Sequence, residues 1–188
     1  AALVDITLTI DEGEVHCLVG ENGAGKSTLG KVVAGIHKAD AGSLSLRGTP
    51  VDFRSPRESI AAGVAFIAQE LAVVPQRSVL ENVFLGRPGR AFGVTGRRTL
   101  LREYAALCAK TGFDVDPDAR AGSLRLAEQQ KIEIMRALAR DAELIIMDEP
   151  TASLAGAEAD QLLRLVTGLR DEGRTVVFVT HFLADALA

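Results

Sequence analysis

The chain of 188 residues contains no tryptophan, one tyrosine and only 4% aromatic residues. Its two cysteines, Cys17 and Cys108, lack metal-like spacing, so we expect free, buried thiols of a reducing cytosol. No apolar run approaches the roughly 20 residues that span a bilayer, and no basic-then-hydrophobic N-terminal segment predicts export. Acidic residues outnumber basic ones, with a net charge of −4, which argues against a nucleic-acid partner.

The remaining composition is that of a globular protein, with 47% hydrophobic and 24% charged residues. Short apolar runs alternate with amphipathic segments, which predicts a mostly parallel sheet covered by helices on both faces. The expected strands are 15–19, 43–46, 64–68, 144–147 and 175–180, with an edge hairpin begun by 3–10. The expected helices are 28–34, 55–62, 78–85, 99–111, 128–140 and one after residue 150. A turn is expected at 47–50, and 87–93 is the most loop-like segment.

A glycine-rich segment between the first apolar strand and the first helix carries the clearest chemical signal. It fits the pattern G-x-x-x-x-G-K-[ST], whose backbone N–H groups and helix N-terminus can cradle phosphate oxygens. Lys26 is expected to neutralise the β- and γ-phosphates, and the Ser27 hydroxyl to bind Mg²⁺. We therefore predict nucleotide binding by Gly20, Glu21, Asn22, Gly23, Ala24, Gly25, Lys26, Ser27 and Thr28.

Three further polar sites each follow an expected apolar strand, at Gln69, Asp148-Glu149 and His181. Ligands bind at the carboxyl edge of parallel sheets, so we expect these groups to meet the glycine-rich segment there. Asp148 is expected to hold Mg²⁺ with Ser27, and Glu149 to act as general base on the attacking water. Gln69 can reach Mg²⁺ or water through its amide, and His181 can orient Glu149 or bind the γ-phosphate.

Together these residues resemble an ATP-binding cassette of the ABC transporter family, over essentially the whole chain. The matching segments, in order, are the Walker A loop at 20–28, the Q-loop at Gln69, the signature segment at 124–130, the Walker B strand at 144–149, the D-loop at 153–155 and the switch histidine at His181. Within the family, 20–28, 69–71 and 81–86 look most like the N-terminal cassette of bacterial monosaccharide importers.

The resemblance implies an α/β P-loop NTPase fold with a small antiparallel β edge. It divides the single domain into a RecA-like core, 1–77 and 141–188, and an inserted α-helical signature subdomain, 78–140. It also implies ATP and Mg²⁺ as cofactors and ATP hydrolysis that powers import of a sugar or similar small solute. The implied partners are a second cassette, transmembrane permease subunits and, indirectly, a periplasmic solute-binding protein, with the chain at the cytoplasmic face of the bacterial inner membrane.

Some positions depart from the family pattern. Arg125 stands where the signature serine would bond the partner's γ-phosphate, Ala127 replaces the close-approach glycine, and Ala155 replaces the usual D-loop acid. No aromatic residue for adenine stacking precedes Phe53, and little chain follows His181, so we expect a truncated cassette. Two alternatives stay open: a cassette ATPase of DNA repair or translation, and a regulatory cassette that binds ATP with little hydrolysis.

Overall fold

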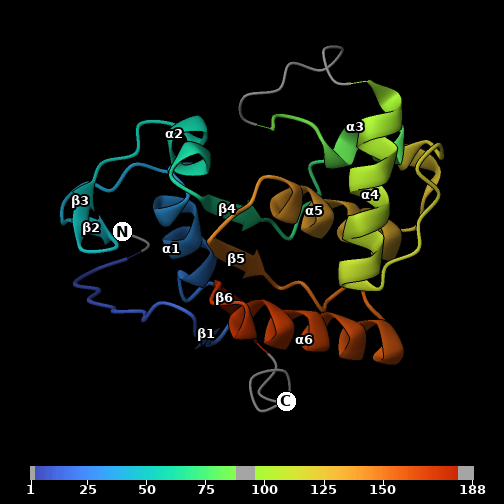
Figure 1. The fold of residues 1–188 in the computed structure, drawn as a ribbon. Helices are drawn as coiled ribbons and strands as arrows, with labels where there is room; N and C mark the ends of the chain where they lie inside the picture. Colours follow the sequence, from blue (N-terminus) through green and yellow to red (C-terminus); the bar gives the residue numbers. More distant parts are fainter. Residues whose placement is uncertain (1–2, 88–95, 182–188) are drawn as a thin grey trace.

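A computed structural model describes residues 3–87 and 96–181 of the chain. Its centre is a four-stranded parallel sheet in the order β1-β6-β5-β4 (Figure 1). The strands are β1 Val15–Val19, β4 Val64–Ile67, β5 Leu144–Asp148 and β6 Thr175–Thr180. β4 is apolar throughout, β5 is apolar up to the buried Asp148, and β6 is apolar between Thr175 and the buried Thr180, because both faces of the sheet are covered. The predicted α/β architecture is therefore confirmed.

Alternate residues of the central strands enter two separate hydrophobic clusters. On one face, Ile145, Met147 and Phe178 pack with residues of α5 Leu126–Ala139 and α6 Gly156–Asp171. On the other face, Ile146 and Val177 pack with residues that include Val33 of α1. Because successive side chains of a strand point to opposite faces, the same short apolar runs provide packing residues for the helices on both faces of the sheet.

The remaining helices stand close to the positions that periodicity predicts. They are α1 Lys26–Val33, α2 Pro56–Ala61, α3 Val79–Val83, α4 Arg97–Thr111 and the short 3₁₀ helix η1 Ala121–Ser123. α3, α4 and α5 pack against one another at the end of the molecule away from β2 and β3 (Figure 1). Helix α1 begins at Lys26, two residues earlier than predicted, so Lys26 and Ser27 lie in its first turn.

The prediction of an edge hairpin begun by 3–10 was wrong. Residues 3–10 form no strand, and their apolar side chains Val4, Ile6 and Leu8 are 67%, 55% and 41% exposed. Alternation makes a segment able to pair, but a strand also needs a neighbouring edge, and none of the described strands supplies one. The antiparallel edge is instead a hairpin of β2 Leu44–Leu46 and β3 Thr49–Val51.

The turn predicted at 47–50 is present at Arg47 and Gly48, but Thr49 and Pro50 belong to β3. The two loop residues, Arg47 and Gly48, both have positive φ, 51° and 71°. That is the pattern of the tight turn whose twist matches antiparallel strands. Proline is tolerated here because the hairpin has only two strands and Pro50 stands on its edge.

Other expectations concern single residues or segments outside the main elements. Cys17 and Cys108 form no disulfide bond, as predicted, but they are half-buried rather than buried. The loop predicted for 87–93 falls outside the described residues from 88 onward, as does the chain after His181. Among the helices that the structure describes, none combines the length and apolarity needed to cross a membrane.

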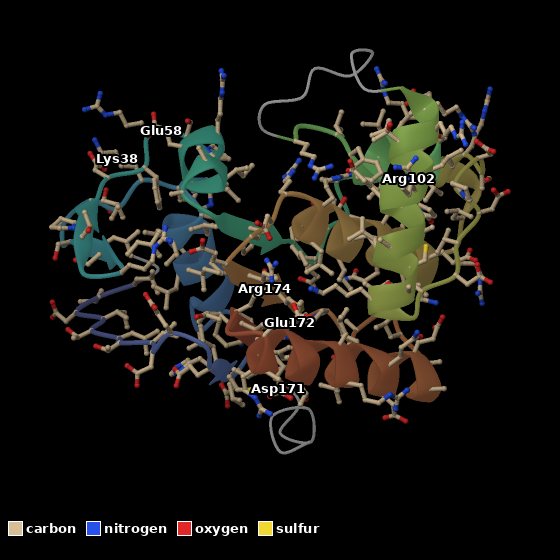
Figure 2. All side chains as sticks on the ribbon, viewed as in Figure 1. Lys38, Glu58, Arg102, Asp171, Glu172 and Arg174 are labelled. Atoms are coloured by element: carbon tan, nitrogen blue, oxygen red, sulfur yellow. The ribbon has the colours of Figure 1, made fainter. Side chains whose placement is uncertain are left out.

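Charged side chains at the amino ends of the strands hold the sheet to its connections. Arg174 pairs with Asp141 at 2.7 Å and lies 3.8 Å from Glu172, and its guanidinium also donates to the Ala142 carbonyl. Figure 2 places Arg174 and Glu172 between the sheet and α6. The hydrogen bond from Arg174 lowers the pKa of Asp141 below its usual value. These ion pairs lie at the amino ends of the strands, whereas the predicted site lies at their carboxyl ends.

Helix α1 packs on the sheet through Gly30. A Cβ added there would lie 2.9 Å from a ring carbon of Phe66 and 3.2 Å from a methyl of Ile146. Both distances are shorter than ordinary packing contacts, and Phe66 cannot move away without disturbing the residues packed around it on that face of the sheet. The close approach of α1 therefore requires glycine at this position.

We expect Gly30→Ala to lower the free energy of unfolding by about 1–2 kcal/mol, because an overpacking cost of roughly 1–3 kcal/mol exceeds the helix-propensity gain. Gly168→Ala is the matched control: Gly168 is also helical, but a Cβ added there would meet nothing within 4 Å. That variant should gain about 0.5–1 kcal/mol. Urea denaturation of both variants measures this, and equal changes would contradict the packing argument.

Candidate phosphate-binding and catalytic site

The parallel register brings every predicted strand-end group to one edge of the sheet. Val19 of β1 is level with Thr180 of β6, and Asp148 of β5 is level with Val179. The glycine-rich segment follows β1 directly, Glu149 follows β5 and His181 follows β6. Gln69 lies two residues beyond the last residue of β4.

The segment between β1 and α1 has the form of an anion cradle. Gly23 and Gly25 have φ of 84° and 89°, values that side chains disfavour, so the chain can turn its N–H groups inward. Gly20 has no such φ, and a Cβ there would meet only ordinary contacts of 3.7 Å, so only the other two glycines are required by the backbone. The loop is exposed from Glu21 to Ala24 and half-buried from Gly25 onward.

Lys26 caps the mouth of this loop. Its Nζ donates to the Gly20 carbonyl at 2.7 Å and to the Glu21 carbonyl at 2.9 Å. The ammonium group is thus held directly over the loop that would receive the phosphates. These two contacts show that the side chain reaches the loop, and a phosphate oxygen there would offer it a full negative charge in place of carbonyl dipoles.

Ser27 and Asp148 form the second pair of the site. The Ser27 hydroxyl donates to Asp148 Oδ1 at 2.8 Å, which joins the phosphate loop to the end of β5. Asp148 is only 3% exposed. Burial raises the pKa of its carboxyl, the Ser27 hydrogen bond lowers it, the Glu149 charge raises it, and the Lys31 and Lys26 charges lower it.

A hydroxyl and a carboxylate side by side are the hard oxygen donors that Mg²⁺ prefers. A buried carboxylate with a raised pKa also gains from a nearby cation, since the cation would favour the charged form. The residues therefore fit Mg²⁺. In the described part of the chain no cluster of three or more His, Cys, Asp and Glu side chains forms a separate metal site.

Glu149 receives one polar group on each carboxylate oxygen. Gln69 Nε2 donates to Oε2 at 3.1 Å, and His181 Nδ1 lies 3.2 Å from Oε1. The Glu149 side chain is 13% exposed and His181 is 30% exposed, so this group borders solvent. The three predicted residues thus meet, although they are separated by up to 112 positions in the chain (181 − 69).

The backbone of Glu149 is in a conformation that non-glycine residues rarely adopt, with φ of 48°. Its N–H donates to the Val179 carbonyl at 2.9 Å, which continues the β5–β6 ladder past the end of β5. A left-handed residue costs about 1–2 kcal/mol, and such strain is found where a side chain must be aimed. Here it directs the carboxylate toward Gln69 and His181.

One electrostatic contributor was absent from the sequence predictions. Lys31 lies on α1 one turn after Ser27, and its charge lowers the pKa of Asp148. The spacing of four residues from Ser27 was a usable signal, because such residues share one helix face. His16 and His37 were not predicted for the site; His16 Nδ1 contacts Glu14 at 3.1 Å, and His37 is exposed.

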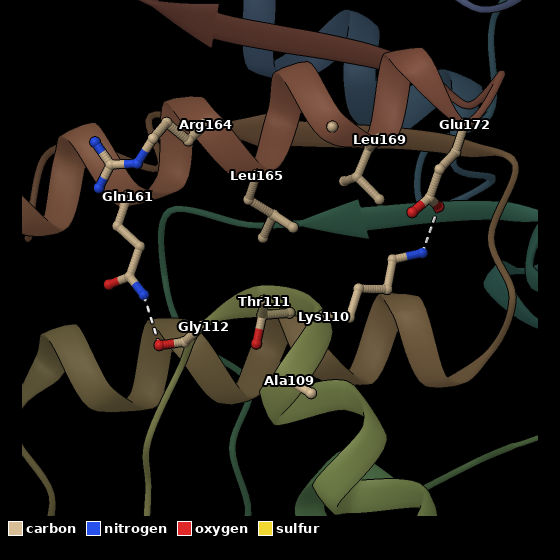
Figure 3. A pocket seen from close by; sticks show the side chains of 10 residues that line it. Ala109, Lys110, Thr111, Gly112, Gln161, Arg164, Leu165, Leu169 and Glu172 are labelled. Atoms are coloured by element: carbon tan, nitrogen blue, oxygen red, sulfur yellow. Dashed lines mark hydrogen bonds and ion pairs between the residues drawn. The ribbon is translucent and has the colours of Figure 1, made fainter.

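A cleft of about 380 Å³ lies elsewhere, between the end of α4 and α6 (Figure 3). Lys110 pairs with Glu172 at one end, and Gln161 Nε2 donates to the Gly112 carbonyl at 2.7 Å at the other. Leu165 lies between these two contacts (Figure 3). None of the predicted site residues lines this cleft, so it is separate from the strand-end site.

The signature segment forms the start of α5. Arg125 stands just before the helix, and its backbone N–H donates to Glu128 at 3.1 Å. The Arg125 side chain is 76% exposed and Leu126 is 64% exposed, whereas Ala127 is buried. None of these residues contacts the phosphate loop among the interactions that the structure describes.

Comparison with known proteins gives a consistent result. Residues 3–152 match the family model of the ABC transporter. The ribose import ATP-binding protein RbsA of Chromobacterium violaceum is 47% identical over 184 residues, which cover 97% of this chain and 37% of that protein. The arabinose import ATP-binding protein AraG 1 of Burkholderia cenocepacia is 47% identical over 180 residues, 96% of this chain and 36% of that protein.

Solved structures show the same fold. A dimeric ATP-binding cassette in a post-hydrolysis state with ADP and Pi has a TM-score of 0.88 at 25% identity, covering 98% of this chain and 82% of that one. An ATP-binding cassette in its ADP conformation has a TM-score of 0.84 at 27% identity, covering 99% and 77%. The chain spans a little over a third of the length of the curated relatives above. On sequence, fold and site geometry together, the chain belongs to the ABC transporter family.

Proposed function

We propose that this chain binds and hydrolyses ATP as part of a bacterial importer of a sugar or similar small solute. The observation that carries the proposal is the meeting of Lys26, the Ser27–Asp148 pair and the Gln69–Glu149–His181 group at one sheet edge. The transport role is supported by two relatives of the chain, which are named as ribose and arabinose import ATP-binding proteins. The solute itself stays open, since no residue of this site is built to recognise a sugar.

Binding begins with the phosphates. Lys26 exchanges its two carbonyl acceptors for β- and γ-phosphate oxygens, and the N–H groups of the glycine-rich loop and of the first turn of α1 are proposed to donate to the same anion. Mg²⁺, held by Ser27 and Asp148 with Gln69 as the further proposed ligand, would neutralise charge on the phosphates. The existing Ser27–Asp148 hydrogen bond already places both donors at the loop.

Hydrolysis then depends on Glu149. Its carboxylate takes a proton from water as the water oxygen bonds to the γ-phosphorus and the bond to the β,γ-bridging oxygen breaks, which yields ADP and phosphate. Gln69 and His181 hold the two carboxylate oxygens, so the base is aimed before substrate arrives. His181 can also donate to the γ-phosphate from the same position.

The exposed signature segment supports a partner. Because Arg125 and Leu126 are exposed, a second cassette is proposed to place its nucleotide against them. Dimers among the solved cassettes are consistent with this arrangement. Permease subunits, indirectly a periplasmic solute-binding protein, and a place at the cytoplasmic face of the inner membrane complete the proposed assembly.

One observation favours a second, narrower role. Arg125 offers no hydroxyl to a partner's γ-phosphate, and the Ala127 methyl occupies the position of a close-approach glycine. We propose that the composite site completed by this segment on the partner is weakly catalytic, while the site built on Lys26 and Glu149 stays active. A fully regulatory cassette would instead show no turnover that depends on Glu149.

We expect Lys26→Ala to weaken ATP binding roughly 30-fold or more, because losing a charge-assisted contact to phosphate costs about 2–5 kcal/mol. Equilibrium titration of the full-length protein with a fluorescent ATP analogue measures this. Lys38→Ala serves as the control, because Lys38 is exposed and lies toward the β2–β3 hairpin (Figure 2). Wild-type affinity in the Lys26 variant would refute the assignment.

Glu149→Gln should keep ATP affinity and lower the hydrolysis rate by about 10²–10⁴-fold, the usual contribution of a general base. Glu143→Gln is the matched control, since Glu143 is exposed, pairs with Arg47 and precedes the same strand. Phosphate release from the complex with its membrane subunits gives the rate. No difference between wild type and the Glu149 variant would favour the regulatory role.

The double change Arg125→Ser with Ala127→Gly should raise ATP turnover of the assembled complex, by about tenfold at the site that the segment completes. The reason is that the serine would supply a hydroxyl donor to the partner's γ-phosphate, and the glycine would let the phosphate approach the backbone closely. Steady-state turnover, with nucleotide affinity measured in parallel, tests this. Unchanged turnover in a complex that still assembles would eliminate the hypothesis of a weak composite site.

A further inference from the structure

A buried polar network outside the site binds the backbone of the segment that follows Gln69. Its members are Asn82 of α3 and Glu133 and Arg136 of α5, which are 0%, 8% and 6% exposed. Buried charges and amides are costly unless they are bonded, so each contact here is tightly specified. The contacts run to backbone groups of residues 72–74.

Asn82 binds one residue of this segment at both of its backbone groups. The Val74 N–H donates to Asn82 Oδ1 at 2.7 Å, and Asn82 Nδ2 donates to the Val74 carbonyl at 3.0 Å. Asn82 Nδ2 also donates to the Ser78 carbonyl at 3.0 Å. The side chain of Asn82 therefore replaces a strand partner for an otherwise irregular segment.

Glu133 and Arg136 hold Ala72, two residues before Val74. Arg136 Nη1 donates to the Ala72 carbonyl at 3.2 Å and to Glu133 Oε1 at 2.9 Å. Burial raises the pKa of Glu133, while the Arg136 and Arg140 charges and the Ala72 N–H lower it. Arg136 also donates from Nε to the Asn82 carbonyl at 2.8 Å and from Nη2 to Asn82 Oδ1 at 3.1 Å.

The segment is fixed further along its length. The Gly122 N–H donates to the Pro75 carbonyl at 3.0 Å, and the Ala121 N–H donates to the Arg77 carbonyl at 3.0 Å. Residues 72–77 are thus bound mainly to α3, α5 and the turn before the signature segment. These contacts bind residues 72–77 to the helices, although the predicted boundary assigned them to the core segment 1–77.

We infer that Arg136, with Asn82 and Glu133, is a positioning residue for Gln69. Only residues 70 and 71 lie between Gln69 and the bound Ala72, so a fixed Ala72 limits where the Gln69 amide can reach. Gln69 in turn holds one oxygen of Glu149. Because α5 begins at the signature segment, the same rigid helix joins the partner-facing surface to the catalytic carboxylate of its own chain.

This inference deepens the proposed ATP hydrolysis and depends on it for its kinetic test. The variant is the double change Glu133→Met with Arg136→Met in the full-length protein, because replacing both members of a buried ion pair leaves no orphaned charge. We expect kcat to fall about 10- to 100-fold, as for other small misplacements of a catalytic group. ATP affinity should stay within about twofold, since no phosphate contact is lost.

Two comparisons separate positioning from a general loss of structure. Arg140→Met is the matched control: Arg140 lies one turn along α5, but its Nη2 donates to the Leu85 carbonyl at 2.7 Å rather than to residues 72–74. It should leave kcat unchanged. In a Gln69→Ala background the double change should add less than about a twofold further loss, because residues that act through one another are non-additive.

Hydrogen exchange provides a readout that needs no hydrolysis. Amides of residues 70–76 should exchange faster in the double variant and not in Arg140→Met. If the double variant does not fold, Arg136→Lys keeps the charge beside Glu133 but not the forked contacts. It should then show a smaller fall in kcat with the same faster exchange.

The outcomes that overturn the inference are specific. They are unchanged kcat and exchange in a folded variant, an equal loss in Arg140→Met, or a full multiplicative loss in the Gln69→Ala background. Failure of the proposed function looks different: wild type would then show no hydrolysis that depends on Lys26. In that case the exchange of residues 70–76 alone decides whether Arg136 holds the segment.

Discussion

The parallel pairing of β1, β6, β5 and β4 is the constraint on which the rest of the structure depends. With Val19 level with Thr180 and Asp148 level with Val179, four separate segments end at one edge. A register shift of one residue would turn each strand's side chains to the opposite face. The site would then lose the Ser27–Asp148 bond, so core packing and site geometry are set by the same register.

The site keeps groups that cost stability in the protein without ligand. Asp148 is buried beside Glu149 with a raised pKa, and Glu149 has a left-handed backbone. Both features weaken the fold slightly, and both are offset by the buried sheet around them. A cation bound beside these two carboxylates would offset their negative charge, so cation binding and stability are expected to rise together.

The network around Arg136 extends this dependence beyond the sheet. Residues 72–77 follow a core strand in sequence but are bound by α3, α5 and the turn at 121–122. Gln69 therefore lies between the end of β4 and a segment that these helices bind. In our proposal the position of its amide depends on α5, which also begins at the exposed signature segment.

Sequence alone determined the type of fold, the phosphate loop and the polar residue at each strand end, because these follow from local periodicity and from residue chemistry at short spacing. It also predicted a strand at 3–10, which was wrong, and extended the turn at 47–50 over the start of β3, since strand formation depends on a neighbour that local pattern does not contain. Only the tertiary structure decided that Gln69 and His181 meet on Glu149 and that Asn82 and Arg136 hold residues 72–74. The physical reason is that such contacts join segments far apart in the chain, and their geometry is set by packing. The phosphate loop needs only its own backbone and the helix that follows it.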